Sequence, residues 1–100
     1  MIYNFNRTKY IDKNDIVEQL EHMASELREI KQELFAADIP RLAEETVDLY
    51  HSCESMMRIL EEKYGIDING VVKEVKIKNE KRGYYGDLRG ITVHNSVESD

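Results

Sequence analysis

The chain is 100 residues long and 41% of its residues are hydrophobic, which predicts a single domain with a small core. Its formal net charge is −6 and its sequence pI is ≈ 5.1. This acidic balance argues against a protein that binds nucleic acid or an anionic membrane through a basic surface. Free nucleotides remain possible partners, because a metal ion can neutralise their charge.

The single cysteine and the N-terminal sequence predict a protein of a reducing compartment. Cys53 is the only cysteine, so no disulfide is expected within the chain. The N-terminal residues lack the apolar run of a signal peptide, and no segment is long and apolar enough to cross a bilayer. These features predict a cytoplasmic protein.

Residues 1–13 form a predicted N-terminal arm. Tyr3, Phe5 and Tyr10 are mixed there with polar and basic residues, and no helical period is present. Two interpretations of the arm are open. Either its rings pack on the rest of the protein or on a partner, or the arm is a flap whose rings stack on a nucleotide base.

The first predicted helix begins after Asn14 or Asp15 and runs to about Ala36. Apolar residues recur along it at intervals of three and four, which is typical of a helix with one stripe facing a core. The stripe consists of Val17, Leu20, Met23, Leu27, Ile30 and Leu34. One flank of this stripe is polar and carries His22, Glu26, Glu29 and Glu33.

The second predicted helix runs from Asp38 to about Tyr64, with Asp38 as its N-cap and Pro40 in its first turn. Its expected buried side consists of Leu42, Thr46, Leu49, Cys53, Met56, Leu60 and Tyr64. The connection to the first helix is so short that the two helices are expected to run antiparallel.

Two carboxylate pairs lie at helical spacing on these helices. Glu26 and Glu29 form an ExxE pair, and Glu45 and Asp48 form an ExxD pair at the edge of the expected buried side. Residues three apart lie on one helix face, so each pair projects its carboxylates in one direction and the antiparallel turn brings the pairs together. His51 follows one turn after Asp48, where a lone histidine is more often a packing residue than a ligand.

Four acids that converge without a counter-charge repel one another and are costly to desolvate. Hard divalent cations prefer oxygen ligands, and Mg²⁺ is held by a few carboxylates together with water and substrate phosphates. The pattern therefore predicts a Mg²⁺ site, with Mn²⁺ as the alternative ion. Its expected ligands are Glu26, Glu29, Glu45 and Asp48.

A third segment, from Ile68 to about Arg82, is ambiguous. Its β-branched run from Val71 to Ile77 favours a strand, whereas an N-cap at Asp67 and a stop at Gly83 favour a helix. The predicted organisation is an arm over 1–13, a helical domain over 14–85 and a C-terminal tail over 86–100.

The order of the acid pairs resembles that of small single-domain members of the MazG-like, all-α nucleoside triphosphate pyrophosphohydrolases, in which ExxE precedes ExxD. Two further motifs match. Leu42–Asp48 reads LAEETVD, similar to the LAEExxD helix of that family, and Lys78–Tyr84 reads KNEKRGY, similar to its KNxxRGY ending. The resemblance covers about Ile16 to Tyr85, and it favours the helix for the third segment.

The resemblance implies hydrolysis of a ribo- or deoxyribonucleoside triphosphate between the α- and β-phosphates, giving the monophosphate and pyrophosphate. In this scheme Glu26, Glu29, Glu45 and Asp48 are catalytic and hold Mg²⁺. The ion screens the phosphates and lowers the pKa of a bound water, and one of the acids or Glu44 takes the water's proton. The residues that the resemblance places at the substrate are Lys78, Asn79, Arg82 and Tyr84.

Other functions use the same amphipathic faces. One is a catalytically silent helical module that oligomerises or sequesters nucleotides, and another is a coiled-coil adaptor built on the heptad-like stripe of the first helix. The presence of all four acids together with Asn79 and Arg82 favours the enzyme. The small core also predicts a homodimer or homotetramer, in which paired hairpins form a four-helix-bundle-type assembly.

Overall fold

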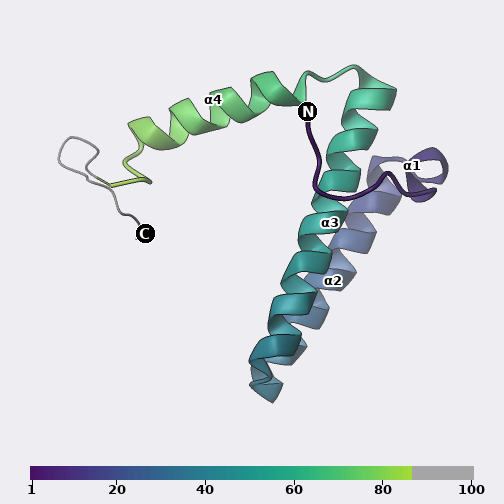
Figure 1. Ribbon diagram of the computed structural model, residues 1–100, viewed down its shortest axis with the longest axis vertical. Coiled ribbons are helices and arrows are strands. Elements are labelled where there is room, and N and C mark those ends of the chain that lie inside the picture. The colour runs from purple at the N-terminus through teal and green to yellow at the C-terminus, as the bar shows by residue number, and fades with distance from the viewer. Residues whose placement is uncertain (87–100) are drawn as a thin grey trace. The chain divides into compact units, whose positions relative to one another are not determined.

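The computed structural model describes residues 1–86, and all regular secondary structure in that range is helical. The helices are α1 (Tyr10–Lys13), α2 (Ile16–Ala36), α3 (Ile39–Tyr64) and α4 (Ile68–Lys81) (Figure 1). The predicted all-α class is confirmed, whereas the predicted tail lies outside the described residues from position 87 onward. Within the described residues the chain divides into two units, 1–66 and 67–86. None of the helices described is long and apolar enough to cross a membrane.

The break between α2 and α3 lies where the sequence predicts it. Asp15 caps α2 in a capping box, in which Glu18 accepts a hydrogen bond from the Asp15 backbone N–H at 2.9 Å. The helix ends at Ala37, whose φ of 57° is left-handed, and Asp38 then caps α3 with Pro40 in the first turn. Local sequence signals therefore fix both ends of the turn.

The ambiguous third segment is the helix α4. The Asp67 side chain accepts the backbone N–H of Gly70 at 3.2 Å, and Gly83 follows the helix with a φ of 75°. A strand would need a neighbouring strand to satisfy its backbone, whereas a helix satisfies most of its hydrogen bonds within the segment. The caps thus outweigh the β-branched composition.

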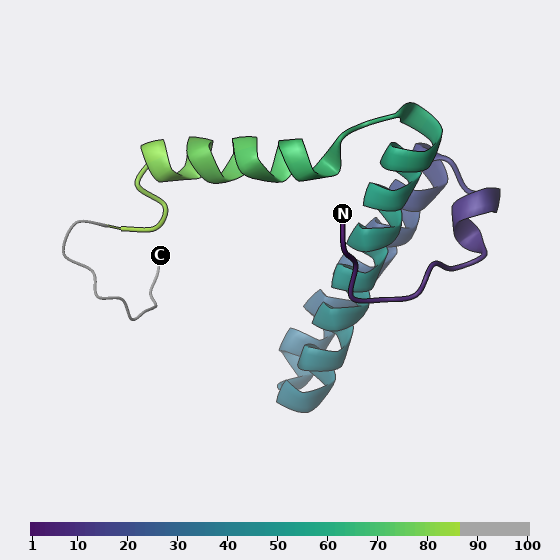
Figure 2. The same ribbon diagram turned by 45° about the horizontal axis from the view of Figure 1, so that its top comes forward.

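Helices α2 and α3 lie side by side and antiparallel in both ribbon views (Figures 1 and 2). Their interface is polar, because the buried side chains there are mostly uncharged polar or acidic ones. The residues that line it recur at intervals of three and four and define a polar seam. On α2 the polar seam consists of Gln19, His22, Glu26, Glu29 and Glu33, and on α3 of Glu45, Asp48, Ser52 and Ser55; the apolar Ile59 follows Ser55 in the same spacing. Gln19 is 2% exposed and Glu45 is 7% exposed, so the centre of the hairpin is formed by polar groups.

Four of the six residues of the predicted apolar stripe of α2 are exposed, and the other two, Met23 and Ile30, are half-buried. Val17 and Leu20 are 61% and 60% exposed, and Leu27 and Leu34 are 46% and 61% exposed. On α3, Thr46 and Tyr64 are also exposed rather than buried, while the other members of its expected buried side are half-buried. The reason is that the polar seam and the apolar stripe lie one residue apart, about 100° around the helix. The polar residue is the more buried of the two neighbours at Gln19, Glu26 and Glu33, whereas Met23 and Ile30 are more buried than the polar residues before them.

The N-terminal arm packs on α3. The backbone N–H groups of Asn4 and Phe5 donate to the Glu54 carboxylate at 2.9 and 3.0 Å, and Arg58 donates to the Phe5 carbonyl at 2.8 Å. Burial alone would raise the pKa of Glu54, but these hydrogen bonds outweigh it and lower the pKa. The Phe5 ring stacks on that of His51 with centroids 4.3 Å apart. The Phe5 ring of the arm therefore contacts α3.

One turn of helix interrupts the arm, which the sequence pattern does not predict. Helix α1 spans only four residues, and its Ile11 is completely buried together with Ile59 of α3. A single apolar side chain gives no periodicity, so this anchor is invisible to a pattern search. It holds the arm along the open side of the hairpin.

Candidate functional site

The structure brings the two predicted carboxylate pairs together across the α2–α3 interface. The Glu26 and Glu45 side chains are 14% and 9% exposed, whereas Glu29 and Asp48 lie at the exposed edge. The antiparallel arrangement sets Glu29 opposite Glu45, and it sets Glu26 opposite Ser52 and near Asp48. All four acids thus face one region between the helices.

The pKa of Glu29 reflects the mutual repulsion of these acids. Its pKa is raised, first because its carboxyl faces that of Glu45 closely enough to share a proton. The negative charge of Glu45 adds to the shift, and the charges of Glu26 and Asp48 contribute further. Two carboxylates in this position are stabilised by a shared proton or by a cation between them.

Glu45 is the most buried of the four acids. Its Oε2 accepts from Arg41 Nε at 3.2 Å, but no hydrogen-bond partner within residues 1–86 reaches its buried Oε1. A buried carboxylate oxygen without a partner is costly, so this position favours a bound donor or cation. Arg41 also lies 3.9 Å from Glu33 and supplies part of the missing positive charge.

Arg41 is a site residue that the sequence analysis missed. Its spacing of four residues before Glu45 is the available signal, because such pairs meet on one helix face. Gln19 was missed as well, and its Nε2 donates to the Ser52 carbonyl at 3.0 Å from a nearly buried position. Gln19 belongs to the same series of residues, spaced three and four apart, that carries the acids of α2. That spacing is the signal that could have identified it.

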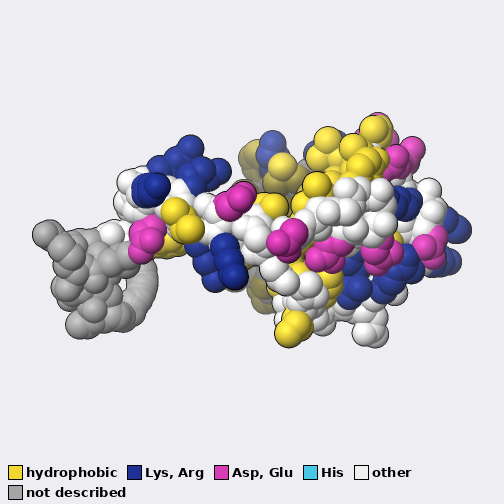
Figure 3. Space-filling model, turned by 90° about the horizontal axis from the view of Figure 1, so that it is seen from above, with side chains coloured by type: hydrophobic (Ala, Val, Ile, Leu, Met, Phe, Trp, Pro, Cys, Tyr) yellow, Lys and Arg dark blue, Asp and Glu magenta, His cyan; other side chains and the backbone are white. Residues whose placement is uncertain are grey.

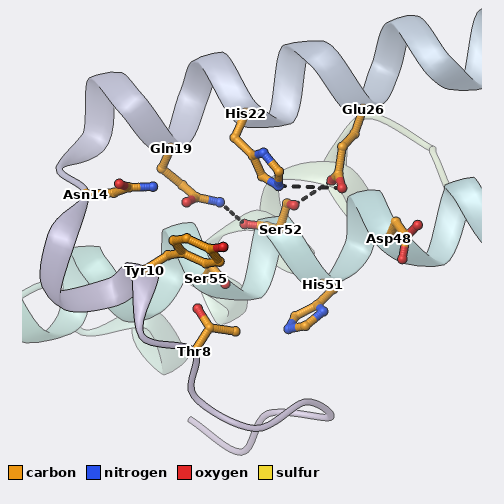
Figure 4. Close-up of a pocket in the computed structure, with 10 residues that line it drawn as sticks. All are labelled: Thr8, Tyr10, Asn14, Gln19, His22, Glu26, Asp48, His51, Ser52 and Ser55. Atoms are coloured by element: carbon orange, nitrogen blue, oxygen red, sulfur yellow. Dashed lines mark hydrogen bonds and ion pairs between the residues drawn. The ribbon is translucent and has the colours of Figure 1, made fainter.

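Glu26 is held in place by neighbours on both helices (Figure 4). The Ser52 hydroxyl donates to its Oε1, and His22 Nε2 lies 3.5 Å from its Oε2. Glu26 is therefore oriented across the interface, toward α3, and is not free to turn into solvent. Ser52 positions this carboxylate.

The acids fit a hard divalent cation by donor type, since all of them offer carboxylate oxygens. In the part of the chain that the structure describes, no group of three or more His, Cys, Asp or Glu side chains is close enough together to hold a metal ion. Glu29 and Asp48 are exposed and can change rotamer, whereas Glu26 and Glu45 are held. A cation would thus draw two mobile ligands onto two fixed ones.

The predicted substrate residues belong to the second unit. Lys78 and Arg82 are one turn apart on α4 and at its C-cap, and both line a shallow hollow of about 400 Å³ on that helix. Asn79 accepts the backbone N–H of Tyr84 at 2.9 Å through its carbonyl, and the Arg82 guanidinium lies 6.0 Å from the Tyr84 ring centroid. These residues form one cluster, and their placement opposite the acids stays a prediction.

Comparison with protein-family models, with curated proteins and with solved structures finds no match to this chain. Its function is therefore inferred from the chemistry of the site and from the motifs that resemble the pyrophosphohydrolases.

Substitution of Glu29 by glutamine is expected to stabilise the metal-free protein at neutral pH. The raised pKa means that the folded state binds this proton more tightly than the unfolded chain does. The stabilisation from that proton is complete below the unfolded pKa and is lost as pH rises through the folded pKa. The amide is uncharged at every pH, so the gain from Glu29→Gln should vanish in acid.

The measurement is the thermal midpoint of both proteins from about pH 4 to about pH 8 with a chelator present. The difference in thermal midpoint between the parent and Glu29→Gln removes the contributions that the other carboxylates make to both proteins. A difference that is constant across this range would show that the Glu29 carboxyl does not interact with Glu45 in solution.

Proposed function

We propose that the protein is a Mg²⁺-dependent nucleoside triphosphate pyrophosphohydrolase, which cleaves ribo- or deoxyribonucleoside triphosphates to the monophosphate and pyrophosphate. The observation that supports this proposal is the juxtaposition of Glu29 and Glu45 across the two helices of the hairpin, with Glu26 and Asp48 beside them. If the apolar stripe of α2 packed on α3 in place of the polar seam, the interface between the two helices would be more stable. Acids at that position are therefore best explained by a ligand that needs them.

The proposed roles follow from how each acid is held. Glu26, fixed by Ser52, and Glu45, fixed by Arg41, would hold the ion together with Glu29 and Asp48. When bound, Mg²⁺ would screen the phosphate charges and acidify a nearby water molecule. One of the four acids, or Glu44 beside them, would take the water's proton.

The cluster on α4 would bind the phosphates. Arg82 offers a rigid fork of donors that matches phosphate oxygens, and Lys78 adds a second charge one turn away. Asn79 supplies a neutral donor, and the Tyr84 ring lies near the guanidinium. In the proposed complex these residues lie opposite the acids, in the same subunit or in a neighbouring one.

The proposed assembly is a homodimer or homotetramer of the four-helix-bundle type. The exposed apolar stripe of α2 is the feature that supports it, because a stripe of this length is rarely left in water. On the face drawn in Figure 3, hydrophobic side chains reach the surface in several places between charged ones. Packing two hairpins along the stripe would leave the polar seam inside each hairpin.

A panel of ribo- and deoxyribonucleoside triphosphates with Mg²⁺ or Mn²⁺, scored for pyrophosphate release, tests the proposal. Release of pyrophosphate that stops on chelation is the expected result. Release of orthophosphate would indicate cleavage at a different bond. Binding without any hydrolysis would favour the nucleotide-sequestering module instead.

Arg82→Lys is expected to lower turnover by about 10- to 100-fold with little change in the thermal midpoint. Lysine keeps the charge at the helix C-terminus but loses the bidentate hydrogen bonds, which contribute about 1.5–3 kcal/mol when the partner is charged. Steady-state kinetics on the preferred triphosphate measure the effect. Arg28→Lys on α2 is the matched control and should retain the parent rate. An Arg82→Lys protein with parental turnover would mean that Arg82 only stabilises the end of α4.

A further inference from the structure

One arginine at the start of α3 supplies a counter-charge to the acids of the polar seam. The Arg41 Nε atom donates to Glu45 Oε2 at 3.2 Å and lies 3.9 Å from Glu33 Oε2. Within residues 1–86, no other lysine or arginine forms an ion pair with an acid of the polar seam. A single positive charge thus faces several carboxylates and leaves them incompletely neutralised.

The stability of α3 does not explain why an arginine lies at this position. Arg41 belongs to the first turn of the helix, where its backbone N–H donates to the capping side chain of Asp38 at 3.0 Å. The positive end of the helix dipole lies at that turn, so a cation there is unfavourable for the helix itself. The acids that Arg41 faces are therefore the best explanation of its placement.

Arg41 is the outer partner of its ion pair with Glu45. Its side chain is 55% exposed, whereas the side chain of Glu45 is 9% exposed. The guanidinium can turn into water at little cost, because an ion pair that is open to solvent contributes little to stability. The buried carboxylate cannot follow it, so the charge of Glu45 must then be met by another cation.

We propose that Arg41 is an exchangeable counter-ion, which pairs with Glu45 in the metal-free protein and is displaced when a divalent cation binds the acids. A divalent ion carries twice the charge and can contact several carboxylates at once, whereas the guanidinium reaches two. In the metal-free protein, Arg41 reduces the repulsion between the two helices. It also competes with the cation, which lowers the affinity of the acids for the free ion.

This inference rests on the proposed function for the identity of the ion, Mg²⁺ or Mn²⁺. The direction of the change in metal affinity tests it. If Arg41 oriented Glu45 in the metal-bound protein, loss of the arginine would weaken metal binding, typically by ~10–100-fold. Because Arg41 instead competes with the ion, we expect Arg41→Gln to bind both ions about 3- to 10-fold more tightly than the parent, as measured by calorimetry on the full chain.

Thermal midpoints give a second measurement that does not depend on activity. With a chelator present, Arg41→Gln should unfold about 2–4 °C below the parent, because the acids lose their counter-charge. With saturating Mg²⁺, the two midpoints should agree within about 1 °C, since the ion replaces the guanidinium in both proteins. Arg41→Lys retains the charge, so its affinity for Mg²⁺ should stay within about twofold of the parent.

Lys31→Gln is the matched control for the loss of one positive charge. Lys31 is exposed on α2 and lies two residues from both Glu29 and Glu33, about 200° around the helix from them. Its removal should change the affinity for Mg²⁺ by less than about twofold. An Arg41→Gln protein that binds Mg²⁺ as the parent does, or more weakly, would overturn the exchange.

The outcomes separate the exchange from the proposed hydrolysis. Tighter Mg²⁺ binding in Arg41→Gln, in a protein that hydrolyses no triphosphate, would support the exchange and overturn the activity. Hydrolysis together with weakened Mg²⁺ binding in Arg41→Gln would keep the activity and overturn the exchange. If neither the parent nor Arg41→Gln binds Mg²⁺ or Mn²⁺ at millimolar concentration, the exchange and the metal site are both overturned.

Discussion

Glu45→Gln is expected to lower the rate of triphosphate hydrolysis by about 10²-fold or more. Loss of a residue that merely supports a metal ligand typically costs ~10–100-fold, and a ligand itself should cost at least as much. Glu45 is the acid for which this expectation is strongest, because its buried Oε1 has no partner in residues 1–86 and is held where a cation would compensate it. The amide keeps the shape of the side chain and removes the ligand charge.

The same substitution should leave the fold intact. Replacing one of two facing carboxyls with an amide removes repulsion and adds a donor that can reach Glu29. We therefore expect the thermal midpoint of Glu45→Gln to equal or exceed that of the parent while Mg²⁺ binding, measured by calorimetry, is lost. Asp48→Asn should behave in the same direction.

Glu21→Gln is the matched control, because Glu21 lies on α2 outside both the polar seam and the apolar stripe and is exposed. It should bind Mg²⁺ and turn over as the parent does. Parental Mg²⁺ binding in both Glu45→Gln and Asp48→Asn would refute the metal site and leave the four acids as a structural network.

The helices were predictable because their signals are local. Asp15, Asp38 and Asp67 each cap a helix through their own side chains, and Gly65 and Gly83 adopt the left-handed conformation after helix ends. Such signals act within a few residues and need no knowledge of the packing. The spacing of the acids is equally local, so their placement on facing helices followed from the short turn alone.

The packing was not predictable from the same pattern. On α2 the polar seam and the apolar stripe have the same three-and-four spacing and differ by one residue, so periodicity fits both equally well. Hydrophobicity favours the stripe as the core, yet Gln19 and Glu26 face α3 while Leu20 and Leu27 face outward. Periodicity alone cannot make this choice, because it does not say which face of α2 packs on α3.

The cavity between the arm and the hairpin also could not be predicted from the sequence. It depends on Thr8 and Tyr10 lying near α3, and that placement is set by Ile11 and by the Glu54 carboxylate that holds the arm. Neither contact has a short-range signature, because the partners are separated by more than forty residues. Two interpretations of the arm were open from the sequence, and the structure shows that the rings of Tyr3 and Phe5 contact α3 while the same arm lines one side of a cavity.

Introducing a lysine in place of Leu20 or Leu27 is expected to dissociate the protein into single chains. The parent should have a mass by light scattering of at least twice the 11.7 kDa of one chain at micromolar concentration. Both leucines are exposed in the single chain, at 60% and 46%, so a lysine there would disturb little unless another subunit covers the site. In an assembly the charge would be buried without a partner, which is strongly unfavourable.

Stability gives an independent measure of the same contact. Exposed surface substitutions usually change the free energy of unfolding by less than about 0.5 kcal/mol, whereas a charge in a buried interface costs several times as much. Because association also stabilises the fold by mass action, the thermal midpoint of the parent should rise with protein concentration and that of Leu27→Lys should not. Gln32→Lys is the matched control, since it adds the same charge at an exposed position of α2 outside both the polar seam and the stripe. A parent that is monomeric at micromolar concentration, or a Leu27→Lys protein that stays assembled, would show that the apolar stripe is not the contact between subunits, and the acids would then have to act within one chain.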